Sequence, residues 1–318
     1  MQTLTILALV TLIAQAAPKT PQPAPAGNDA LQLQVMLDRA GFSPGTIDGR
    51  MGANTKKALE AYQKGGNAGA PSGQALTTYT ITTEDAAGPF VDRVPADMVE
   101  MGKLPALGYT SIAEVLSERF HTTPAFLQQL NPGVQFTAGQ QIQVPNVEPM
   151  AIPETQKEPA KEPAARGRSA QPKPESQAPA KPDVVVIVSK TTSAATVTDA
   201  QGKVIFYAPV TTGSQHDPLP IGEWKVNGVQ LNPKFRYNPD LFWDAEPSHT
   251  KATIASGPNN PVGLVWIDLS KPHYGLHGTP EPTMIGRTQS HGCVRLTNWD
   301  ALRLAALVKP GTRVEFKE

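Results

Sequence analysis

The chain has 318 residues, and its 28 Lys plus Arg equal its 28 Asp plus Glu, so the formal net charge is zero. This balance favours neither a nucleic-acid nor a membrane-surface partner, because both attract a basic excess. The length allows about two domains of roughly 150 residues each. Proline (32) and glycine (26) are enriched locally, which predicts turn-rich β structure and a linker rather than a wholly disordered chain.

The N-terminus has the pattern of a secretory signal. An apolar run from Leu4 to Ile13 is followed by Ala14-Gln15-Ala16-Ala17, which predicts a signal peptide at 1–17 that is removed on export. The run is too short to span a bilayer as a helix. We therefore expect an exported protein of the periplasm or cell wall.

Two helices are predicted after the signal. The first begins at Asn28 or Asp29, because either side chain can cap it, and it ends at Gly41. The second begins where Asn54 or Thr55 caps it. Apolar residues recur on one face of each helix, which is typical of a small helical core: Leu33, Met36, Leu37 and Ala40 in the first, and Ala58, Leu59 and Tyr62 in the second.

The loop between these helices has a characteristic spacing: Gly41-Phe42, Pro44-Gly45, Ile47-Asp48-Gly49 and Gly52. On these residues the range 29–66 resembles the three-helix peptidoglycan-binding domain, which implies that it binds peptidoglycan. A calcium loop at Asp48 is excluded, because one carboxylate does not make a site of six to eight oxygens.

A second module is predicted over residues 105–147. It has one helix with a continuous apolar face, a second helix begun by Thr122 or Thr123 before Pro124, and a final alternating strand. The apolar positions of the first helix are Ile112, Val115, Leu116 and Phe120, and the strand follows Gly139 as Ile142-Gln143-Val144-Pro145.

With the turn Leu130-Asn131-Pro132-Gly133, this order resembles a LysM module, a small βααβ fold that binds glycan. The family's first strand does not follow Tyr109, so we expect residues 78–81 to supply it, with 83–108 inserted. The LysM-like module then covers 78–147 with its core at 105–147. A purely structural role is the alternative to glycan binding.

Residues 148–182 are rich in proline, alanine and charged residues and contain almost no large apolar side chains. Such a segment does not bury a core, so we predict a Pro-rich extended linker.

From residue 183 to the end the pattern is β, with apolar strands separated by proline and glycine. Strands are expected at 184–188, on both sides of the turn 199–202, and at 223–226, 264–269 and 313–316. One helix is expected after Thr297, where Thr297 to Asp300 fits a capping box, and it runs to Val308.

Cys293 is the only cysteine in the chain. A leftover thiol in an exported protein is reactive or links to another chain, with an inert buried thiol as the alternative. A thiol needs a neighbouring base to become a competent nucleophile, and His277 and His291 are both available by sequence. Gly292 leaves the backbone N–H groups around Cys293 open to a substrate carbonyl.

The motif Ser290-His291-Gly292-Cys293-Val294-Arg295, with the distant pair His277-Gly278, resembles the YkuD-type L,D-transpeptidase catalytic domain over 183–318. The resemblance implies a mostly-β sandwich or barrel with one helix. It also implies that Cys293 attacks the carbonyl before the terminal D-alanine of a peptidoglycan tetrapeptide stem. The acyl group then passes to an amine on a second stem peptide or on a lipoprotein; with water as acceptor the enzyme is a carboxypeptidase.

The resemblance assigns the base role to His277 and the orientation of its imidazole to the carbonyl of Gly278. His291 is a weaker candidate, because on an extended strand its side chain would lie parallel to that of Cys293. Ser290, His291 and Gly292 are expected to shape the substrate site, and Arg295 to hold that site or meet a carboxylate. The modules before the linker are expected to place the enzyme on the wall without taking part in the chemistry.

Two other classes of function remain. One is a wall-binding structural protein with an inactive catalytic domain. The other is a metal site built from His273, His277, His291 and Cys293, although their spacing matches no usual zinc signature. No cofactor or metal is predicted. The expected partners are peptidoglycan stem peptides and glycan strands and a wall-anchored lipoprotein, with no nucleic acid, and the protein is expected to be a monomer.

Overall fold

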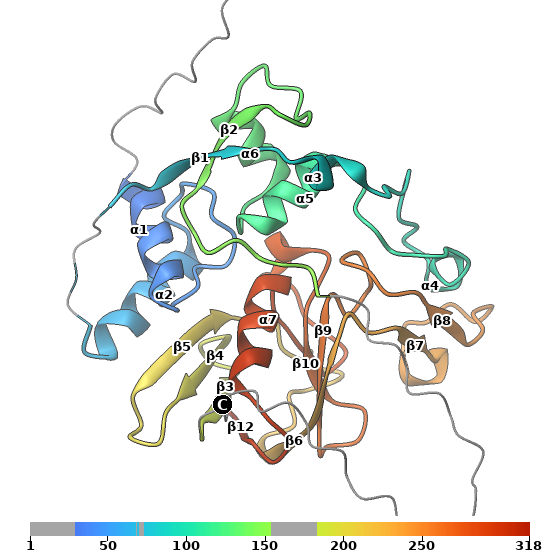
Figure 1. Cartoon of the computed structure of the whole chain (residues 1–318). Helices are drawn as coiled ribbons and strands as arrows, with labels where there is room; N and C mark the ends of the chain where they lie inside the picture. Colours follow the sequence, from blue (N-terminus) through green and yellow to red (C-terminus); the bar gives the residue numbers. More distant parts are fainter. Residues whose placement is uncertain (1–28, 68, 70–72, 154–182) are drawn as a thin grey trace, which may run out of the picture.

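A computed structural model describes residues 29–67, 69, 73–153 and 183–318 (Figure 1). The signal peptide predicted at 1–17 and nearly all of the linker predicted at 148–182 lie outside these residues. Within the described ranges no helix is both long enough and apolar enough to cross a membrane.

The first module consists of helices α1 (Asp29–Arg39) and α2 (Ala53–Lys64). Three helices were expected for 29–66, but the described residues of this range form two. The chain between them stays irregular because its glycines adopt positive φ, which helical residues do not: Gly41 (83°), Gly45 (76°) and Gly49 (70°).

The predicted cap of α2 is wrong. Gly52 occupies the N-cap position and makes no side-chain cap bond. Asn54 instead donates from Nδ2 to the carbonyl of Ile285 (3.1 Å). Thr55 Oγ1 accepts from Gln34 Nε2 of α1 (3.1 Å). Both side chains that were predicted as caps therefore make tertiary hydrogen bonds instead.

The second module has the order strand, helix, helix, strand. Strand β1 (Leu76–Thr80) pairs antiparallel with β2 (Gln141–Pro145), and helices α5 (Ile112–Arg119) and α6 (Pro124–Leu130) lie between them in the chain. The strand expected at 78–81 is thus found as β1. The segment inserted after it contains two short helices, α3 (Thr83–Ala87) and α4 (Met98–Met101).

The C-terminal domain is built on one eight-stranded sheet with the strand order β11-β10-β9-β6-β12-β3-β4-β5. Its strands are β3 (Val185–Ser189), β4 (Ala194–Thr198), β5 (Val204–Pro209), β6 (Gly222–Leu231), β9 (Val265–Leu269), β10 (Gly275–His277), β11 (Val294–Arg295) and β12 (Arg313–Lys317). A separate pair, β7 (Phe235–Tyr237) and β8 (Ala252–Ile254), forms a small second sheet. Two 3-10 turns, η1 (Pro239–Leu241) and η2 (Pro282–Met284), lie in the loops.

The sheet curls until its two edges meet. Just beyond β5, Thr211 exchanges two backbone hydrogen bonds with Arg295 of the opposite edge strand β11 (3.0 and 2.9 Å). Next to this pair, Gly213 forms an isolated parallel β-bridge with Ser290. The expected sandwich or barrel is therefore a single curled sheet closed by a short seam (residues 211–213 against 290–295), and the cysteine motif lies on that seam.

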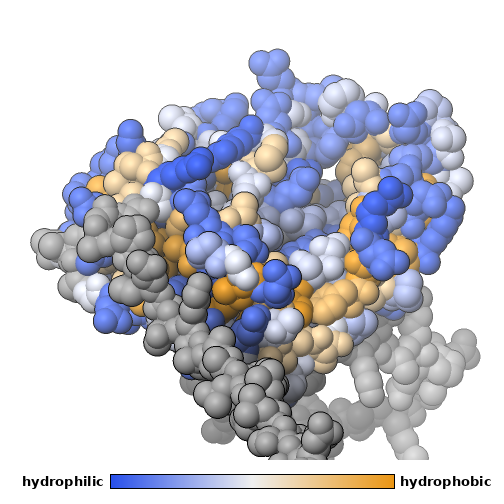
Figure 2. All heavy atoms as spheres, turned by 90° about the horizontal axis from the view of Figure 1, so that it is seen from above, coloured by the Kyte–Doolittle hydropathy of each residue, from blue (hydrophilic) through white to orange (hydrophobic). Residues whose placement is uncertain are grey.

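One α-helix, α7 (Asn298–Leu307), covers the inner face of this sheet (Figure 1). Thr297 caps it by accepting from the N–H of Asp300, as predicted. The core beneath it contains large, almost fully buried side chains, among them Trp299, Leu304, Ile267 and Phe316. The outer surface, seen in Figure 2 from the side of the N-terminal modules, is mostly hydrophilic with smaller hydrophobic groups.

Both N-terminal modules pack directly on the C-terminal domain (Figure 1). Arg303 of α7 forms a two-pronged contact with Asp38 of α1 (3.1 and 2.8 Å), and Asp38 also bonds His121 of the second module (3.0 Å). His121 stacks on Trp299 of α7 (5.1 Å between ring centroids). All three parts of the chain therefore share one buried polar junction.

We expect Arg303→Met to destabilise the folded chain by about 3 kcal/mol. The substitution leaves the buried carboxylate of Asp38 without one of its positively charged partners. Burial alone would raise the pKa of Asp38, but His121 and Arg303 outweigh it and hold that pKa well below its usual range. The stabilisation from Asp38 is thus present above the ordinary aspartate pKa and is lost as the pH falls below it. Denaturant unfolding at pH 7 and at low pH measures both effects; an unchanged midpoint in the variant contradicts the expectation.

Candidate active site

The short parallel pair β10–β11 brings the predicted catalytic residues together. His277 lies opposite Arg295 in the register, and Leu276 lies opposite Val294. Since side chains alternate along a strand, His277 and Arg295 lie on one face, while Leu276 and Val294 point into the core. Cys293 directly precedes β11, and its sulfur accepts a backbone hydrogen bond from Gly275, the first residue of β10.

His277 is held by its own backbone neighbour. Its Nδ1 is hydrogen-bonded to the carbonyl oxygen of Gly278 (2.7 Å). A carbonyl only accepts, so Nδ1 carries the proton and Nε2 of the neutral ring carries a free electron pair. Burial, aided by the charge of Arg295, lowers the pKa of His277 to about 3, so the ring is neutral at pH 7.

The indole ring of Trp266 in β9 packs against one face of this imidazole. The two rings stack with centroids 5.6 Å apart and an interplanar angle of 21°. The indole reaches this position across Gly275, where any Cβ would come within 2.7 Å of it. Sequence analysis missed Trp266; its place at an alternate position of the 264–269 strand was the available signal.

The thiol of Cys293 is half-buried. Its Sγ–H donates a hydrogen bond to the backbone carbonyl of His273 (3.6 Å). Burial raises its pKa, although a backbone hydrogen bond from Gly275 and the charge of Arg295 oppose that effect. The resting pair is therefore a neutral thiol next to a neutral imidazole rather than a preformed ion pair.

Ser290 shapes the turn that carries the thiol. Its Oγ–H donates to the carbonyl of Cys293 (2.6 Å), and the same oxygen accepts from the N–H of Gly292 (3.2 Å). Its own N–H donates to the carbonyl of Thr212 across the seam (3.1 Å). Ser290 thus ties the cysteine turn to itself and to the opposite edge of the sheet.

Gly292→Ala should disturb this turn, because Gly292 has φ 104° and an added Cβ would come within 2.8 Å of the Tyr274 ring. The left-handed conformation alone costs about 1 kcal/mol or more for a residue with a Cβ. We expect a lower melting temperature and slower modification of Cys293 by a small alkylating reagent. Gly311→Ala, also at positive φ (89°) but with open space around it, is the matched control; equal loss of Cys293 reactivity in both variants would contradict the expected clash.

His291 turns away from the thiol. Residues 291–293 form a bend rather than an extended strand, so the expected parallel alignment of His291 with Cys293 does not occur. Its Nε2 is hydrogen-bonded to Asp244 (2.8 Å), and its ring packs against Phe242 (5.0 Å between centroids). These contacts join the cysteine turn to the loop 238–250.

Arg295 provides a positive charge that acts on both members of this pair. It is the charged neighbour that shifts the pKa of both His277 and Cys293. The four residues considered for a metal site do not converge: in the described residues, no group of three His, Cys, Asp or Glu side chains is arranged to hold an ion.

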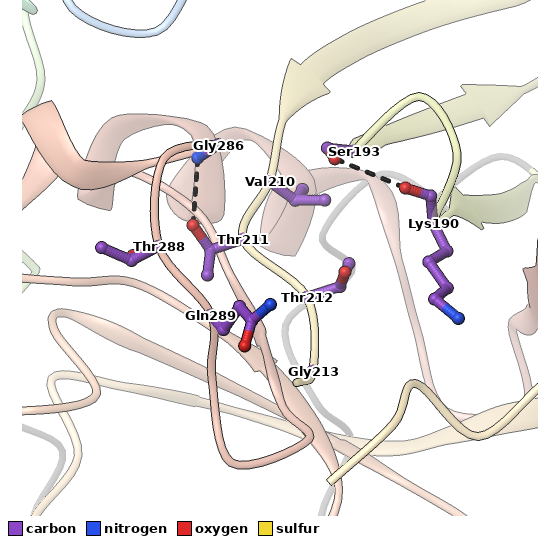
Figure 3. A pocket seen from close by; sticks show the side chains of 9 residues that line it. All are labelled: Lys190, Ser193, Val210, Thr211, Thr212, Gly213, Gly286, Thr288 and Gln289. Carbon is purple, nitrogen blue, oxygen red and sulfur yellow. Dashed lines mark hydrogen bonds between the residues drawn. The ribbon is translucent and has the colours of Figure 1, made fainter. Parts of the chain in front are cut away.

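A cavity of about 250 Å³ lies next to the seam, between residues 190–213 and the loop 286–289 (Figure 3). It is lined by Lys190, Ser193, Val210, Thr211, Thr212, Gly213, Gly286, Thr288 and Gln289. Figure 3 shows the hydrogen bond from the N–H of Gly286 to Thr211 Oγ1 (3.0 Å), which ties its two walls together. Neither Cys293 nor His277 lines this cavity, so it is separate from the thiol.

The comparisons with known proteins agree with this architecture. Residues 183–316 match the family model of the L,D-transpeptidase catalytic domain, YkuD, and residues 26–67 match that of a putative peptidoglycan binding domain. The putative L,D-transpeptidase YqjB of Bacillus subtilis is 33% identical over 138 residues, which are 42% of this chain and 70% of that protein. The putative L,D-transpeptidase YkuD of B. subtilis is 28% identical over 61% of this chain and 87% of that protein.

Other matches are partial. The putative L,D-transpeptidase YkuD of B. licheniformis is 51% identical over 59 residues, so the match spans 36% of its length and 19% of this chain. Among solved structures, an L,D-transpeptidase from Stackebrandtia nassauensis is 24% identical, with 43% of this chain and 56% of that chain covered and a TM-score of 0.32. An L,D-transpeptidase from Mycobacterium smegmatis is 18% identical over 43% of this chain and 59% of that chain, with a TM-score of 0.35.

The C-terminal domain is thus an enzyme domain of the L,D-transpeptidase type, joined to a helical domain of the peptidoglycan-binding type. With a relative at 33% identity of which the chain covers 70%, the chain belongs to the L,D-transpeptidase family.

Proposed function

We propose that this protein is an exported cysteine L,D-transpeptidase that acts on the tetrapeptide stems of peptidoglycan, with Cys293 as nucleophile and His277 as general base. The observation that carries the proposal is that the chain's only thiol directly precedes β11 while a neutral imidazole ends the paired strand β10, with the charge of Arg295 acting on both. The stem peptide as substrate follows from the family, and the N-terminal domain type supports a cell-wall location.

In the reaction, His277 Nε2 takes the thiol proton as Sγ bonds to the carbonyl carbon before the terminal D-alanine. The thiol first turns from the His273 carbonyl toward the imidazole; catalytic hydrogen bonds often tighten only when substrate is bound. The backbone N–H of Cys293 stabilises the oxyanion, whereas the N–H of Gly292 already donates to Ser290 Oγ (3.2 Å), contrary to the expectation that Gly292 leaves it open. The C–N bond then breaks, D-alanine leaves with the proton from His277, and a thioester remains on Cys293.

An amine completes the transfer by attacking this thioester, while His277 accepts the amine proton and returns it to the sulfur. The acceptor is a side-chain amine of a second stem peptide or a lysine of a wall-anchored lipoprotein. Water in place of the amine gives a carboxypeptidase. Gly278 orients the imidazole, Ser290 and His291 shape the substrate site, and Arg295 meets a carboxylate of the stem.

The two N-terminal modules bind the wall in this proposal. The βααβ order of the second module supports its assignment as LysM-like, and its glycan affinity is measured by sedimentation with isolated sacculi. The protein is proposed to act as a monomer without cofactor, outside the cytoplasm after cleavage of residues 1–17.

The test is incubation of the purified mature chain with a tetrapeptide stem, with and without an added amine acceptor, followed by mass analysis. We expect D-alanine release in both cases, a dimer cross-linked through the side-chain amine of a second stem in both cases, and a stem–amine conjugate only when the amine is added. Release without any cross-link would favour the carboxypeptidase, and absence of both products would overturn the proposed function.

A further inference from the structure

Glu118, near the end of α5, connects the second module to the catalytic domain. The side chain is buried, with 8% of the residue exposed. Its Oε2 accepts from the Tyr109 hydroxyl of its own module (2.5 Å), and its Oε1 accepts from Nδ2 of Asn298 at the start of α7 (2.7 Å). Burial raises the pKa of Glu118 to about 7, although these two hydrogen bonds oppose that rise.

The contact with Glu118 fixes the orientation of the Asn298 amide. A carboxylate oxygen accepts this bond, so the NH₂ end of Asn298 faces Glu118 and the carbonyl end faces away. There Asn298 Oδ1 accepts from the N–H of Leu264 (2.9 Å). Asn298 Nδ2 also donates to the carbonyl of Pro258 (3.3 Å), a longer bond than the one to Glu118, and a flipped amide would lose all three bonds. Thr297 is the N-cap of α7, and Asn298 in the first turn is buried in this junction.

The oxygen of Asn298 supports the backbone that holds the imidazole. It lies so close to the Cα atoms of Gly263 and Gly278 that a Cβ on either glycine would overlap it. Gly278 is the residue whose carbonyl oxygen is hydrogen-bonded to His277 Nδ1 (2.7 Å). Movement of Asn298 therefore displaces the surface on which the peptide between His277 and Gly278 rests.

We propose that Glu118 is a positioning residue for the active site: acting through Asn298, it holds the His277–Gly278 backbone in its working place. The second module would then complete the catalytic domain in addition to binding the wall, unlike the expectation that the N-terminal modules take no part in the chemistry. This inference rests on the proposed function, since it takes His277 as the base.

A polar contact between Glu118 and Asn298 is better suited to orienting the Asn298 amide than to merely holding the second module on the C-terminal domain. Burying a carboxylate costs stability, and a well-packed hydrophobic pair would hold two modules together at least as well. A hydrophobic side chain, however, does not fix the direction of an amide. Small misplacements of catalytic groups have large effects, since a shift of about 1 Å can cost about 10²-fold in rate.

The experiment compares three variants of the mature full-length chain. Glu118→Ala removes the contact. Glu118→Gln keeps the side-chain length, so its carbonyl oxygen can accept from Asn298 while its NH₂ donates to the Tyr109 oxygen. Glu114→Ala is the matched control, because Glu114 lies one turn earlier on α5 and bonds the catalytic domain at Asn259 (2.9 Å). We measure kcat and KM on a tetrapeptide stem and the rate of Cys293 alkylation by iodoacetamide against pH.

We expect Glu118→Ala to lower kcat about 10-fold or more with KM within about twofold, the signature of a misplaced catalytic group. Its alkylation curve should be displaced from that of the wild type. Glu118→Gln and Glu114→Ala should keep kcat within about threefold and leave the curve in place. Equal losses in Glu118→Ala and Glu114→Ala, or no rescue by Glu118→Gln, would overturn the inference.

If Glu118→Ala does not fold, Glu118→Asp takes its place, because it keeps the charge and is too short to reach both partners; a wild-type kcat in that variant would equally overturn the inference. Failure of the proposed function is recognised separately. In that case the wild-type chain shows no Cys293-dependent turnover, while the alkylation curves still report whether Glu118 sets the surroundings of the thiol.

Discussion

Replacing Cys293 with alanine is expected to abolish covalent acyl-enzyme formation. No other thiol exists in the chain, so no second sulfur can substitute as nucleophile. Intact-mass measurement after incubation with a tetrapeptide stem or a carbapenem should show an acyl adduct on the wild type and none on Cys293→Ala. A persistent adduct on the variant would exclude Cys293 as the nucleophile.

The loss in Cys293→Ala should be chemical rather than structural. Cys293 is half-buried and donates one long hydrogen bond to His273, so its truncation should change the free energy of unfolding by about 1 kcal/mol. Equal melting curves for variant and wild type are the control. If the variant unfolds at the assay temperature, loss of the adduct says nothing about the nucleophile, and Cys293→Ser then serves as the milder replacement.

Replacing His277 with glutamine is expected to lower kcat at least about 10²-fold, the lower range for a lost general base. His291→Gln should cost less, because the Nε2 of His291 is already bonded to Asp244. Turnover of both variants across pH measures the ranking. A larger loss in His291→Gln would transfer the base role to that residue.

The pH dependence of stability gives a second test of His277. The pKa of His277 is about 3 in the folded chain and near 6.5 when unfolded, so the unfolded chain binds more protons between those values. Its contribution to stability is therefore complete above pH 6.5 and is lost as the pH falls toward 3. We expect the stability of His277→Gln to be less sensitive to acid in this window. Activity of the wild type should not fall through protonation of His277 between pH 5 and 7.

The sequence predicted the elements whose signals are local. The continuous apolar run 184–188 predicted β3, the apolar segments 264–269 and 313–316 predicted β9 and β12, and Thr123-Pro124 predicted the start of α6. The short strands β10 and β11 were missed, because three or two residues carry no periodicity. They exist because tertiary pairing holds them, and they are the strands that carry His277 and lead from Cys293.

Predictions from sequence spacing also failed where a side chain could either cap a helix locally or form a hydrogen bond to a distant part of the chain. Asn54 has the chemistry of a cap, yet it bonds Ile285 in another domain, more than two hundred positions away in the chain. The contribution of Glu118 to the site could not be predicted, because the local sequence of its helix does not distinguish it from a surface glutamate. Only the docked arrangement of the modules shows that it meets Asn298.

The seam between Thr211 and Arg295 also bears on when the site comes into being. The two residues are roughly 80 positions apart, and closing so long a loop is entropically unfavourable until the strands between them are in place. Ser290, which shapes the cysteine turn, is tied across the same seam. We therefore expect the thiol to acquire its surroundings late in folding, so that a partly folded chain carries Cys293 without the geometry needed to use it.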